Sequence, residues 1–271
     1  MRLRFLGTRG NIDARSWLHR LHASLGVAYR GRWVMIDCGA DWRDRLAALR
    51  PRAIVITHAH PDHAAGLSAG APCPVYATEE TWAALRRWPI EHRVVIRPRE
   101  PIRIRGLTFE AFPVVHSIRA PAVGYRITGG LAAIFYVPDL VSIPDVRAAL
   151  GGVRLYVGDG ASLVRPVIRW RDGVPFGHSP IRTQLRWCAE AGVPRAIFSH
   201  CGTGIVTAEP SEVEDRVRSM GRELGVEASV AYDGLELGVR GARRRRARPG
   251  SAGRRPCVGS ERTAGSARKG R

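Results

Sequence analysis

The sequence predicts an α/β fold, a four-layer αββα sandwich in which two β-sheets face each other and helices cover both outer faces. Three observations lead to this prediction. Residues 1–240 alternate between short apolar runs and helical patterns. Strand-like runs come in pairs between helices at the front, and a second such group follows at the back. Several runs end in histidine or aspartate. In layered α/β folds, binding sites gather at such strand ends.

The strand predictions follow short runs rich in β-branched and aromatic residues, which are bounded by glycine, proline or charged residues. In chain order they are Leu3–Leu6, Leu25–Tyr29, Trp33–Ile36, Ala53–Ile56, Val75–Ala77, Val94–Ile96, Ile102–Ile104, Leu107–Phe112, Val123–Ile127, Ala132–Val137, Val153–Val157, Ala196–Phe198, Ala228–Tyr232 and Leu235–Val239.

The helix predictions rest on helical spacing of apolar residues and on end signals. Thr78 and Ser179 are expected to start helices, the second with Pro180 at the first helical position. Gly192 and Gly225 are expected to stop helices. The predicted helices are Trp42–Leu49, Glu79–Arg87, Val146–Leu150, Pro180–Ala191 and Pro210–Leu224.

The composition indicates a folded, cytoplasmic protein. A chain of 271 residues with 45% hydrophobic residues can bury a sizeable core in one large domain or two small ones. No apolar stretch reaches the roughly 18 residues that a membrane span needs, and the first residues are too short in apolar content for a secretory signal. The five cysteines are an odd number without a CxxC pair, so reduced thiols are expected.

The charge is uneven along the chain. The net charge is +19, and residues 241–271 contribute +10 of it, from eleven basic residues and Glu261. This tail has almost no large apolar residue and is predicted to remain disordered. We therefore expect one folded domain over residues 1–240 and a basic tail over 241–271. The tail is either a dispensable extension or an arm that binds a polyanion.

The strongest functional signal is a six-residue stretch with three histidines and one aspartate. It follows the apolar run Ala53–Thr57, which is typical of a buried strand. In an extended chain, residues two apart point to the same side, so His58 and His60 can converge on one ion. Asp62 and His63 lie in the turn that follows and can face a second ion. Imidazole and carboxylate suit borderline divalent metals.

Four more polar residues come at the ends of predicted strands, namely Asp37, His116, Asp139 and His200. A single histidine after a strand is more often an ordinary polar residue than a ligand. Together with the histidine cluster, however, these residues supply the number of side chains that two metals need.

At this point the chain resembles the metallo-β-lactamase-fold hydrolases. The matching pattern is Asp37, the His58-x-His60-x-Asp62-His63 signature, His116, Asp139 and His200, in that order. Four further segments resemble the branch that contains cyclic-phosphate phosphodiesterases and RNase Z: Phe5-Leu6-Gly7-Thr8, Gly177-His178-Ser179, Phe198-Ser199-His200 and the segment 231–237. The resemblance covers residues 1–240 and implies a hydrolase with two divalent metal ions.

The resemblance also implies a role for each matching residue. The first ion would be bound by His58, His60 and His116, the second by Asp62, His63 and His200, and Asp139 would bridge the two. Asp37 would support the histidine loop from outside, because ligand orientation depends on such partners. Nitrogen and oxygen ligands suit zinc, manganese or iron, with zinc as our first expectation. The dizinc β-lactamases have a cysteine where Asp139 stands, so antibiotic hydrolysis is disfavoured.

The expected chemistry follows from two ions about 3.5–4 Å apart, which can hold a bridging water and lower its pKa toward about 7. The resulting hydroxide would attack phosphorus or an acyl carbon. Asp62 and His178 are the predicted catalytic residues. His178 resembles the histidine of this branch that contacts substrate, and it would protonate the leaving group. Alternatively, His178 caps the helix that starts near Pro180.

Three residues are candidates for binding a substrate phosphate. Arg119 lies three residues past His116, and arginine forks fit phosphate oxygens. Thr203 lies in a glycine-flanked turn whose N–H groups can cradle an anion. His22 is the third. A surface or structural role is the alternative for each. The stretch Gly158–Gly177 is predicted to form a modest active-site loop.

The sequence therefore predicts a metal-dependent phosphodiesterase whose substrate is small and either cyclic or nucleotide-like. Two alternatives stay open: a lactone or thioester hydrolase on the same site, and an RNA-processing nuclease that uses the basic tail. The enzymes that open phosphoribosyl cyclic phosphate carry a cysteine-rich zinc loop after the first strand, whereas Thr8–Ser24 has no cysteine. The expected partner is a small phosphorylated substrate, or RNA in the alternative case. The oligomeric state is left open, a homodimer included.

Overall fold

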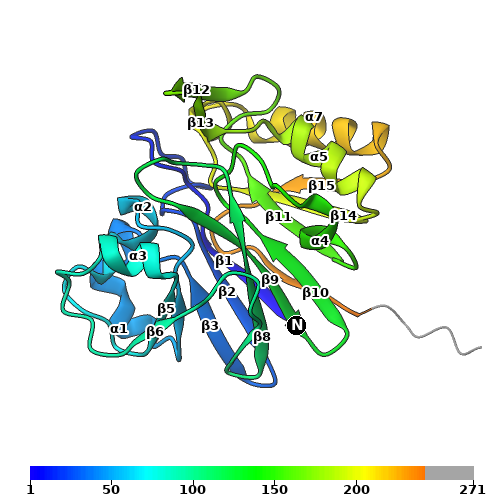
Figure 1. Ribbon diagram of the computed structural model, residues 1–271. Coiled ribbons are helices and arrows are strands. Elements are labelled where there is room, and N and C mark those ends of the chain that lie inside the picture. The colour runs from blue at the N-terminus through cyan, green and yellow to red at the C-terminus, as the bar shows by residue number, and fades with distance from the viewer. Residues whose placement is uncertain (242–271) are drawn as a thin grey trace, which may run out of the picture.

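Two seven-stranded sheets lie face to face in the computed structural model, which describes residues 1–241 (Figure 1). The first has the spatial order β16 (Glu236–Gly238), β1 (Arg2–Gly7), β2 (Ser24–Tyr29), β3 (Arg32–Ile36), β4 (Ile54–Val55), β5 (Val75–Ala77), β6 (Arg93–Val95). The second has the order β15 (Glu227–Val230), β14 (Arg195–Ser199), β11 (Leu155–Asp159), β10 (Ala132–Tyr136), β9 (Ala122–Gly129), β8 (Leu107–Val114), β7 (Ile102–Ile104).

Helices cover the outer face of each sheet (Figure 1). Against the first sheet pack η1 (Ala40–Arg45), α1 (Leu46–Leu49) and α3 (Glu79–Ala84). Against the second pack α4 (Val146–Leu150), α5 (Ile181–Glu190) and α7 (Pro210–Glu223). The predicted four-layer αββα sandwich is confirmed.

The alternation of apolar residues explains the central layer. In β1, Leu3 and Phe5 are fully buried between the sheets, whereas Arg2 and Arg4 are exposed. The same core contains Phe109 from β8 and side chains of β9 and β10. Two further apolar layers lie between each sheet and its helices. The core thus holds the strands rigidly while their ends remain free to carry polar residues.

Each predicted strand is present, with small shifts at its ends. Thr78 caps α3, as predicted, because its side chain accepts a hydrogen bond from the N–H of Thr81. The prediction that Ser179 starts a helix was wrong by one position: Pro180 is the cap, and the Ser179 hydroxyl donates to the carbonyl of Val141. Three short helical segments were not predicted: α2 (Pro61–Ala64), η2 (Ala65–Leu67) and α6 (Thr203–Val206).

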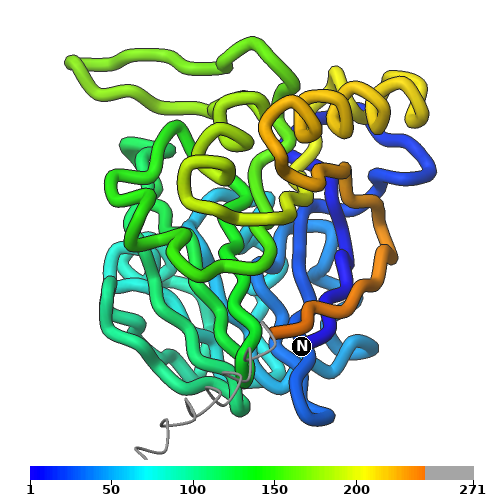
Figure 2. The backbone as a smooth tube through the Cα atoms, turned by 90° about the vertical axis from the view of Figure 1, so that its right-hand side faces the viewer, coloured from blue at the N-terminus to red at the C-terminus, as the bar shows by residue number. Residues whose placement is uncertain are grey.

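The stretch predicted as an active-site loop contains a two-stranded hairpin instead of a loop alone. Its strands are β12 (Val167–Arg171) and β13 (Val174–His178), which pair only with each other. Figure 2 shows this hairpin projecting from the top of the body, above the edge of the second sheet. Its second strand ends at His178, so the hairpin is connected directly to a predicted catalytic residue.

Three other predictions concern the tail, membrane spans and the cysteines. Residues 242–271 of the predicted tail lie outside the described residues, so the domain boundary at 240 stays a prediction. Among residues 1–241, no helix combines the length and apolar character that crossing a membrane requires. The four cysteines of this part are buried, free thiols: Cys38, Cys73, Cys188 and Cys201.

Candidate active site

Parallel strands carry polar residues to one edge of the second sheet. β10, β11 and β14 are parallel neighbours, and β8 shares their direction because β9 pairs antiparallel with both β8 and β10. Their carboxyl ends therefore meet at the same edge. His116 and Asp139 follow β8 and β10, Asp159 ends β11, and His200 follows β14.

The first sheet presents its own edge to the same place. β3 and β4 are parallel, so Asp37 after β3 and the histidine loop after β4 lie side by side. A hydrogen bond between the sheets fixes their relative position just below the loop: the buried Tyr125 hydroxyl donates to the carbonyl of Ile56, at 2.8 Å. The sandwich thus brings residues that are distant in sequence to one point.

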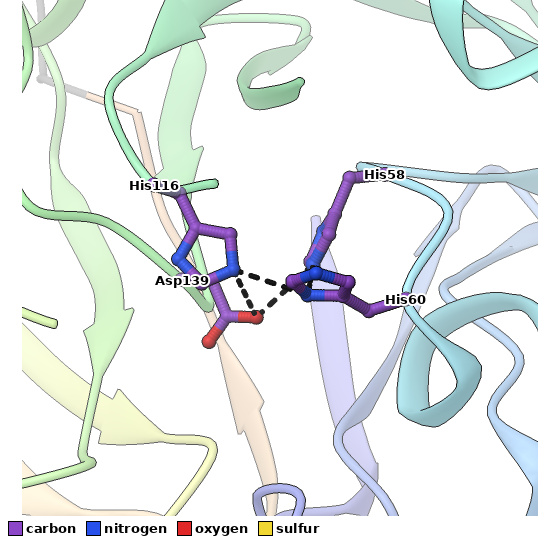
Figure 3. Close-up of side chains that lie close together, drawn as sticks. All are labelled: His58, His60, His116 and Asp139. Atoms are coloured by element: carbon purple, nitrogen blue, oxygen red, sulfur yellow. Dashed lines mark hydrogen bonds and ion pairs between the residues drawn. The ribbon is translucent and has the colours of Figure 1, made fainter. Parts of the chain in front are cut away.

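Figure 3 shows His58 and His60 on one side facing His116 and Asp139 on the other. One nitrogen or oxygen of each lies within 4.8 Å of the others. Two more groups meet the same limit: Asp62, His63, Asp139 and His200, and then Asp139, Asp159, His178 and His200. The structure brings together all seven predicted ligands. Whether they bind metal stays a prediction.

Asp139 lies at the centre, because it belongs to all three groups. Its Oδ2 is 2.9 Å from His63 Nε2 and 3.2 Å from His58 Nε2, while its Oδ1 is 2.8 Å from His200 Nδ1. The carboxylate therefore contacts histidines of both predicted ion sites, which is the position expected of a bridging ligand.

Asp37 orients the histidine loop from outside. Its carboxylate accepts hydrogen bonds from the N–H and hydroxyl of Thr57 and from His63 Nδ1, at 2.8–3.0 Å. Because the Thr57 hydroxyl donates to Asp37, it can accept from His58 Nδ1, at 3.0 Å. His63 and His58 are thereby held with Nε2 facing the centre. This matches the outer support that was predicted for Asp37.

His116 is oriented in the same way by the hairpin. Its Nδ1 donates to the carbonyl oxygen of Gly177 at 3.0 Å, and its own carbonyl accepts from the N–H of Gly177 at 2.8 Å. The donated Nδ1 proton leaves Nε2 unprotonated and directed at the centre. Gly177 has a φ of +118°, a conformation that favours glycine, so the residue type here is required by the backbone.

Two site residues have an unusual backbone. Asp37 has a φ of +62° and His200 a φ of +56°, both in the left-handed region that side chains rarely adopt. Such strain costs on the order of 1–3 kcal/mol and persists only where the surroundings impose it. Both residues directly follow a strand, so the turn bends each side chain back toward the centre.

The two predicted ion sites differ in charge. Burial lowers the pKa of His58 well below its ordinary value and that of His60 to about 4, so both are neutral imidazoles. Burial also acts on His63 and His200, but nearby carboxylates outweigh it and raise the pKa of both histidines, with Asp62 foremost for His63 and Asp139 foremost for His200. The second site thus has the more negative field, which favours a cation.

The donor set fits bound divalent ions. Four buried atoms have no hydrogen-bond partner among the described residues: Asp62 Oδ1, His63 Nε2, Asp139 Oδ1 and His200 Nδ1. These four atoms lie close to charged or titratable neighbours, but none of these contacts has the geometry of a hydrogen bond. Buried polar atoms nearly always have a partner. A cation among these lone pairs would satisfy all four, and their nitrogen and oxygen chemistry suits zinc, manganese or iron.

Asp159 is a site residue that the sequence reasoning missed. Its Oδ2 is 2.8 Å from His178 Nδ1. Burial lowers the pKa of His178, but the carboxylate of Asp159 outweighs it and raises that pKa above the ordinary value. Among the described residues, His178 Nε2 has no hydrogen-bond partner, and the ring lines the cavity described below. The helix-capping alternative for His178 is not supported, since α5 has no side-chain cap.

A cavity of about 480 Å³ opens beside these residues. Its lining includes His60, His116 and His178, together with Ser117, Arg119 and hairpin residues such as Arg169 and Arg171. Arg119, a predicted phosphate contact, is therefore a lining residue of this cavity, and its role stays a prediction. Arg169 and Arg171 were not predicted, since no pattern distinguished them among the many arginines.

His22 and Thr203 lie elsewhere. His22 Nδ1 is 2.9 Å from Asp41, and its Nε2 is 3.1 Å from the buried Arg9. Neither His22 nor Thr203 lines the cavity, and Thr203 is exposed at the start of the four-residue helix α6. Their predicted role in binding phosphate therefore gains no support from the structure.

Comparison with known families decides the identity of the fold. A family model for the β-lactamase superfamily domain matches residues 32–201, which span the site from Asp37 to His200. The chain belongs to the β-lactamase superfamily. It is a metal-dependent hydrolase of this superfamily, as the sequence predicted.

Individual relatives in the superfamily agree with the predicted branch. The ribonuclease Z of Methanopyrus kandleri is 26% identical over 285 residues, covering 88% of this chain and 98% of that protein. A solved diphosphatase from the PhnP family is 26% identical, with a TM-score of 0.66 and coverage of 88% and 97%. The metallo-β-lactamase fold protein YhfI from Bacillus subtilis has a TM-score of 0.67 at 16% identity, covering 87% of this chain and 98% of its own, and supports the fold alone.

Proposed function

We propose that this protein hydrolyses a small, nucleotide-like phosphodiester. The reaction would use two bound divalent ions, for which zinc is the first candidate. One observation carries the proposal: a single cavity is lined by His60 and His116 of the centre, by His178 and by three arginines, with no aspartate or glutamate among its described lining residues. An anionic phosphodiester fits this charge better than a neutral lactone or thioester does.

The seven residues at the centre would hold the ions: His58, His60, His116, Asp62, His63, His200 and Asp139. When bound, the ions would polarise the phosphoryl oxygens and supply the activated water. Asp37 holds His58 and His63 in orientation, and the carbonyl of Gly177 does the same for His116. The chain thus fixes its ligand nitrogens before any ion or substrate arrives.

His178 would act as the general acid. In hydrolysis, a water oxygen forms a new bond to phosphorus, the bond from phosphorus to the leaving oxygen breaks, and that oxygen takes up a proton. We assign this proton to Nε2 of His178, a residue that lines the cavity. Asp159 would hold the ring through Nδ1 and stabilise its charged form. Asp159 in turn is held by the buried Gln184, whose Oε1 accepts a hydrogen bond from the backbone N–H of Asp159 at 2.9 Å.

The test is a substrate screen with the metal-loaded protein. We expect turnover of bis(p-nitrophenyl) phosphate, and much slower turnover of an acyl lactone and a thioester at the same concentration. Metal removal by a chelator should abolish activity, and added zinc or manganese should restore it. Faster hydrolysis of the lactone or thioester than of the diester would replace this proposal with an acyl hydrolase on the same site.

A second candidate is an RNA-processing nuclease, because a ribonuclease Z is similar over 88% of the chain. Deleting residues 241–271, of which 242–271 lie outside the described part, separates the two. For a small-substrate phosphodiesterase, the deletion should leave turnover of bis(p-nitrophenyl) phosphate nearly unchanged. For a nuclease with a basic arm, it should sharply weaken RNA binding and flatten its salt dependence. Under either function we propose that the protein is located in the cytoplasm.

A further inference from the structure

Three arginines line the cavity, and the folding of the chain does not account for them. The side chains of Arg119 and Arg169 have no hydrogen bond or ion pair with any part of residues 1–241, and the side chain of Arg171 has only a 3.8 Å pair with the exposed Asp172. In contrast, Arg126 donates to three carbonyls at the end of α4. The cavity wall therefore presents guanidinium groups whose donors are free for a ligand.

The hairpin places two of these arginines in register with His178. Val167 pairs with His178, Arg169 with Phe176, and Arg171 with Val174. Residues two apart in a strand share a face, so Arg169 and Arg171 lie on the His178 face of the hairpin. Each step of two residues advances roughly 7 Å. The hairpin is thus a row of cations that starts at the proposed general acid and leads away from the centre.

The charge of the centre makes this row significant. Four carboxylates surround the centre: Asp37, Asp62, Asp139 and Asp159. Two divalent cations would bring four positive charges and His178, as the proposed general acid, a fifth, so the sum is about +1. A single phosphodiester carries one negative charge. The centre therefore has no excess of positive charge for a second anionic group, whereas the hairpin wall does.

We propose that the substrate is a phosphodiester that carries a second phosphate group, and that Arg169 and Arg171 bind this second group. Guanidinium forks match phosphate oxygens in geometry and charge. Phe176, which lines the cavity between these arginines and His178, offers an apolar surface for the part of the substrate that joins the two phosphates. The inference rests on the proposed phosphodiesterase function and assigns its selectivity to the hairpin.

The experiment compares two chromogenic substrates that differ in one group: the p-nitrophenyl ester of thymidine 5′-phosphate, with and without a phosphate at the 3′ oxygen. The metal-loaded wild-type protein should prefer the doubly phosphorylated substrate by about five- to tenfold in kcat/KM, the size expected for two exposed charge pairs. Higher ionic strength should reduce this preference. In the double variant Arg169→Ala/Arg171→Ala the preference should vanish, because kcat/KM should fall much more for the doubly phosphorylated substrate than for the plain one.

Two further variants keep the result interpretable. Arg103→Ala removes an exposed arginine of β7 that does not line the cavity, and it should keep the full preference. Arg169→Lys/Arg171→Lys keeps the charge and should retain part of the preference. Thermal unfolding of each variant shows whether the hairpin change has affected the fold.

The outcomes separate the two levels of the argument. Equal kcat/KM of the wild type for the two substrates would overturn the inference and leave the phosphodiesterase intact. An equal loss on both substrates in the double variant would also overturn it, because the arginines would then serve the scissile phosphate or the fold. Failure of the wild type to cleave either substrate would overturn the proposed function itself, and the inference with it.

Discussion

The metal centre and the hairpin face the same cavity, but the chain holds them in different ways. At the centre, His58, His63 and Asp37 are fully buried, and each is fixed by a hydrogen-bond partner. On the hairpin, Trp170 is 69% exposed and Val167 is 45% exposed, and the two strands pair only with each other. A buried, braced region tolerates little change, whereas an exposed ribbon can vary its side chains without loss of stability. We infer that reaction chemistry depends on the centre and substrate choice on the hairpin.

The largest effect should come from the middle of the centre. Asp139→Ala removes the carboxylate that contacts histidines of both predicted ion sites. Loss of an outer partner costs roughly 10–100-fold in metal affinity, so loss of this central ligand should cost more, and both metal and activity should disappear. Metal analysis and turnover of bis(p-nitrophenyl) phosphate measure this. The exposed Asp44→Ala is the matched control. Two bound metals with full activity in Asp139→Ala would refute the site assignment.

The next effect lies where the two regions meet. His178→Ala should keep both metals but slow turnover, by roughly 10²–10⁴-fold for substrates with poor leaving groups. The loss should be much smaller for p-nitrophenolate, which leaves without a proton. Asp159→Asn should follow the same trend more weakly, since the ring loses its charged partner but remains in place. An equal slowing on good and poor leaving groups would rule out the acid role.

A smaller effect should follow from the outer support of the histidine loop. Asp37→Ala removes the acceptor of His63 Nδ1 and of Thr57, so the ring orientation is no longer fixed. We expect metal affinity to fall by about 10–100-fold, with kcat largely recovered at saturating metal. A competition titration with a chromophoric chelator measures the affinity. An unchanged affinity would mean that the histidines are oriented by the ions alone.

These differences also explain how much the sequence could predict. The histidine loop and the strand-end residues were found because each follows a buried, strongly apolar strand whose end is visible in sequence. Asp159 obeys the same rule, since it ends β11. It was missed because the predicted strand stopped at Val157, before the small Gly158. A glycine in a strand pattern usually predicts that the strand ends there. Here Gly158 lies inside β11 and is required by close packing against Gln184 and Tyr156.

The hairpin could not be recognised from local pattern. β12 has the sequence Val-Ile-Arg-Trp-Arg, and four of its five residues are exposed, so it lacks the alternation that burial produces. Pro175 and Gly177 in β13 further weaken the strand signal. Likewise, nothing local shows that Arg169 faces the cavity, because that depends on pairing with Phe176 and on where the ribbon attaches.

The smallest effect concerns a buried histidine outside both regions, which tests whether burial alone distinguishes the centre. His19 is 5% exposed, as enclosed as His116, but its partners are Thr8 and, more distantly, Asp233. Burial lowers the pKa of His19. Below about pH 6.5, His19 therefore binds a proton in the unfolded chain but not in the folded chain. The free energy of unfolding is retained above that pH and decreases as the pH falls below it.

Urea unfolding of metal-free protein between pH 8 and pH 5 measures this loss against His19→Gln, which keeps a hydrogen-bonding side chain without the titration. The difference in unfolding free energy between the two proteins should shift in favour of His19→Gln on acidification, by at most about 1.4 kcal/mol per pH unit for one proton. Parallel curves would mean that the folded protein protonates His19 freely. A buried histidine would then not need a neighbouring carboxylate to carry a charge, and the argument that the carboxylates of the centre create its affinity for ions would lose its basis.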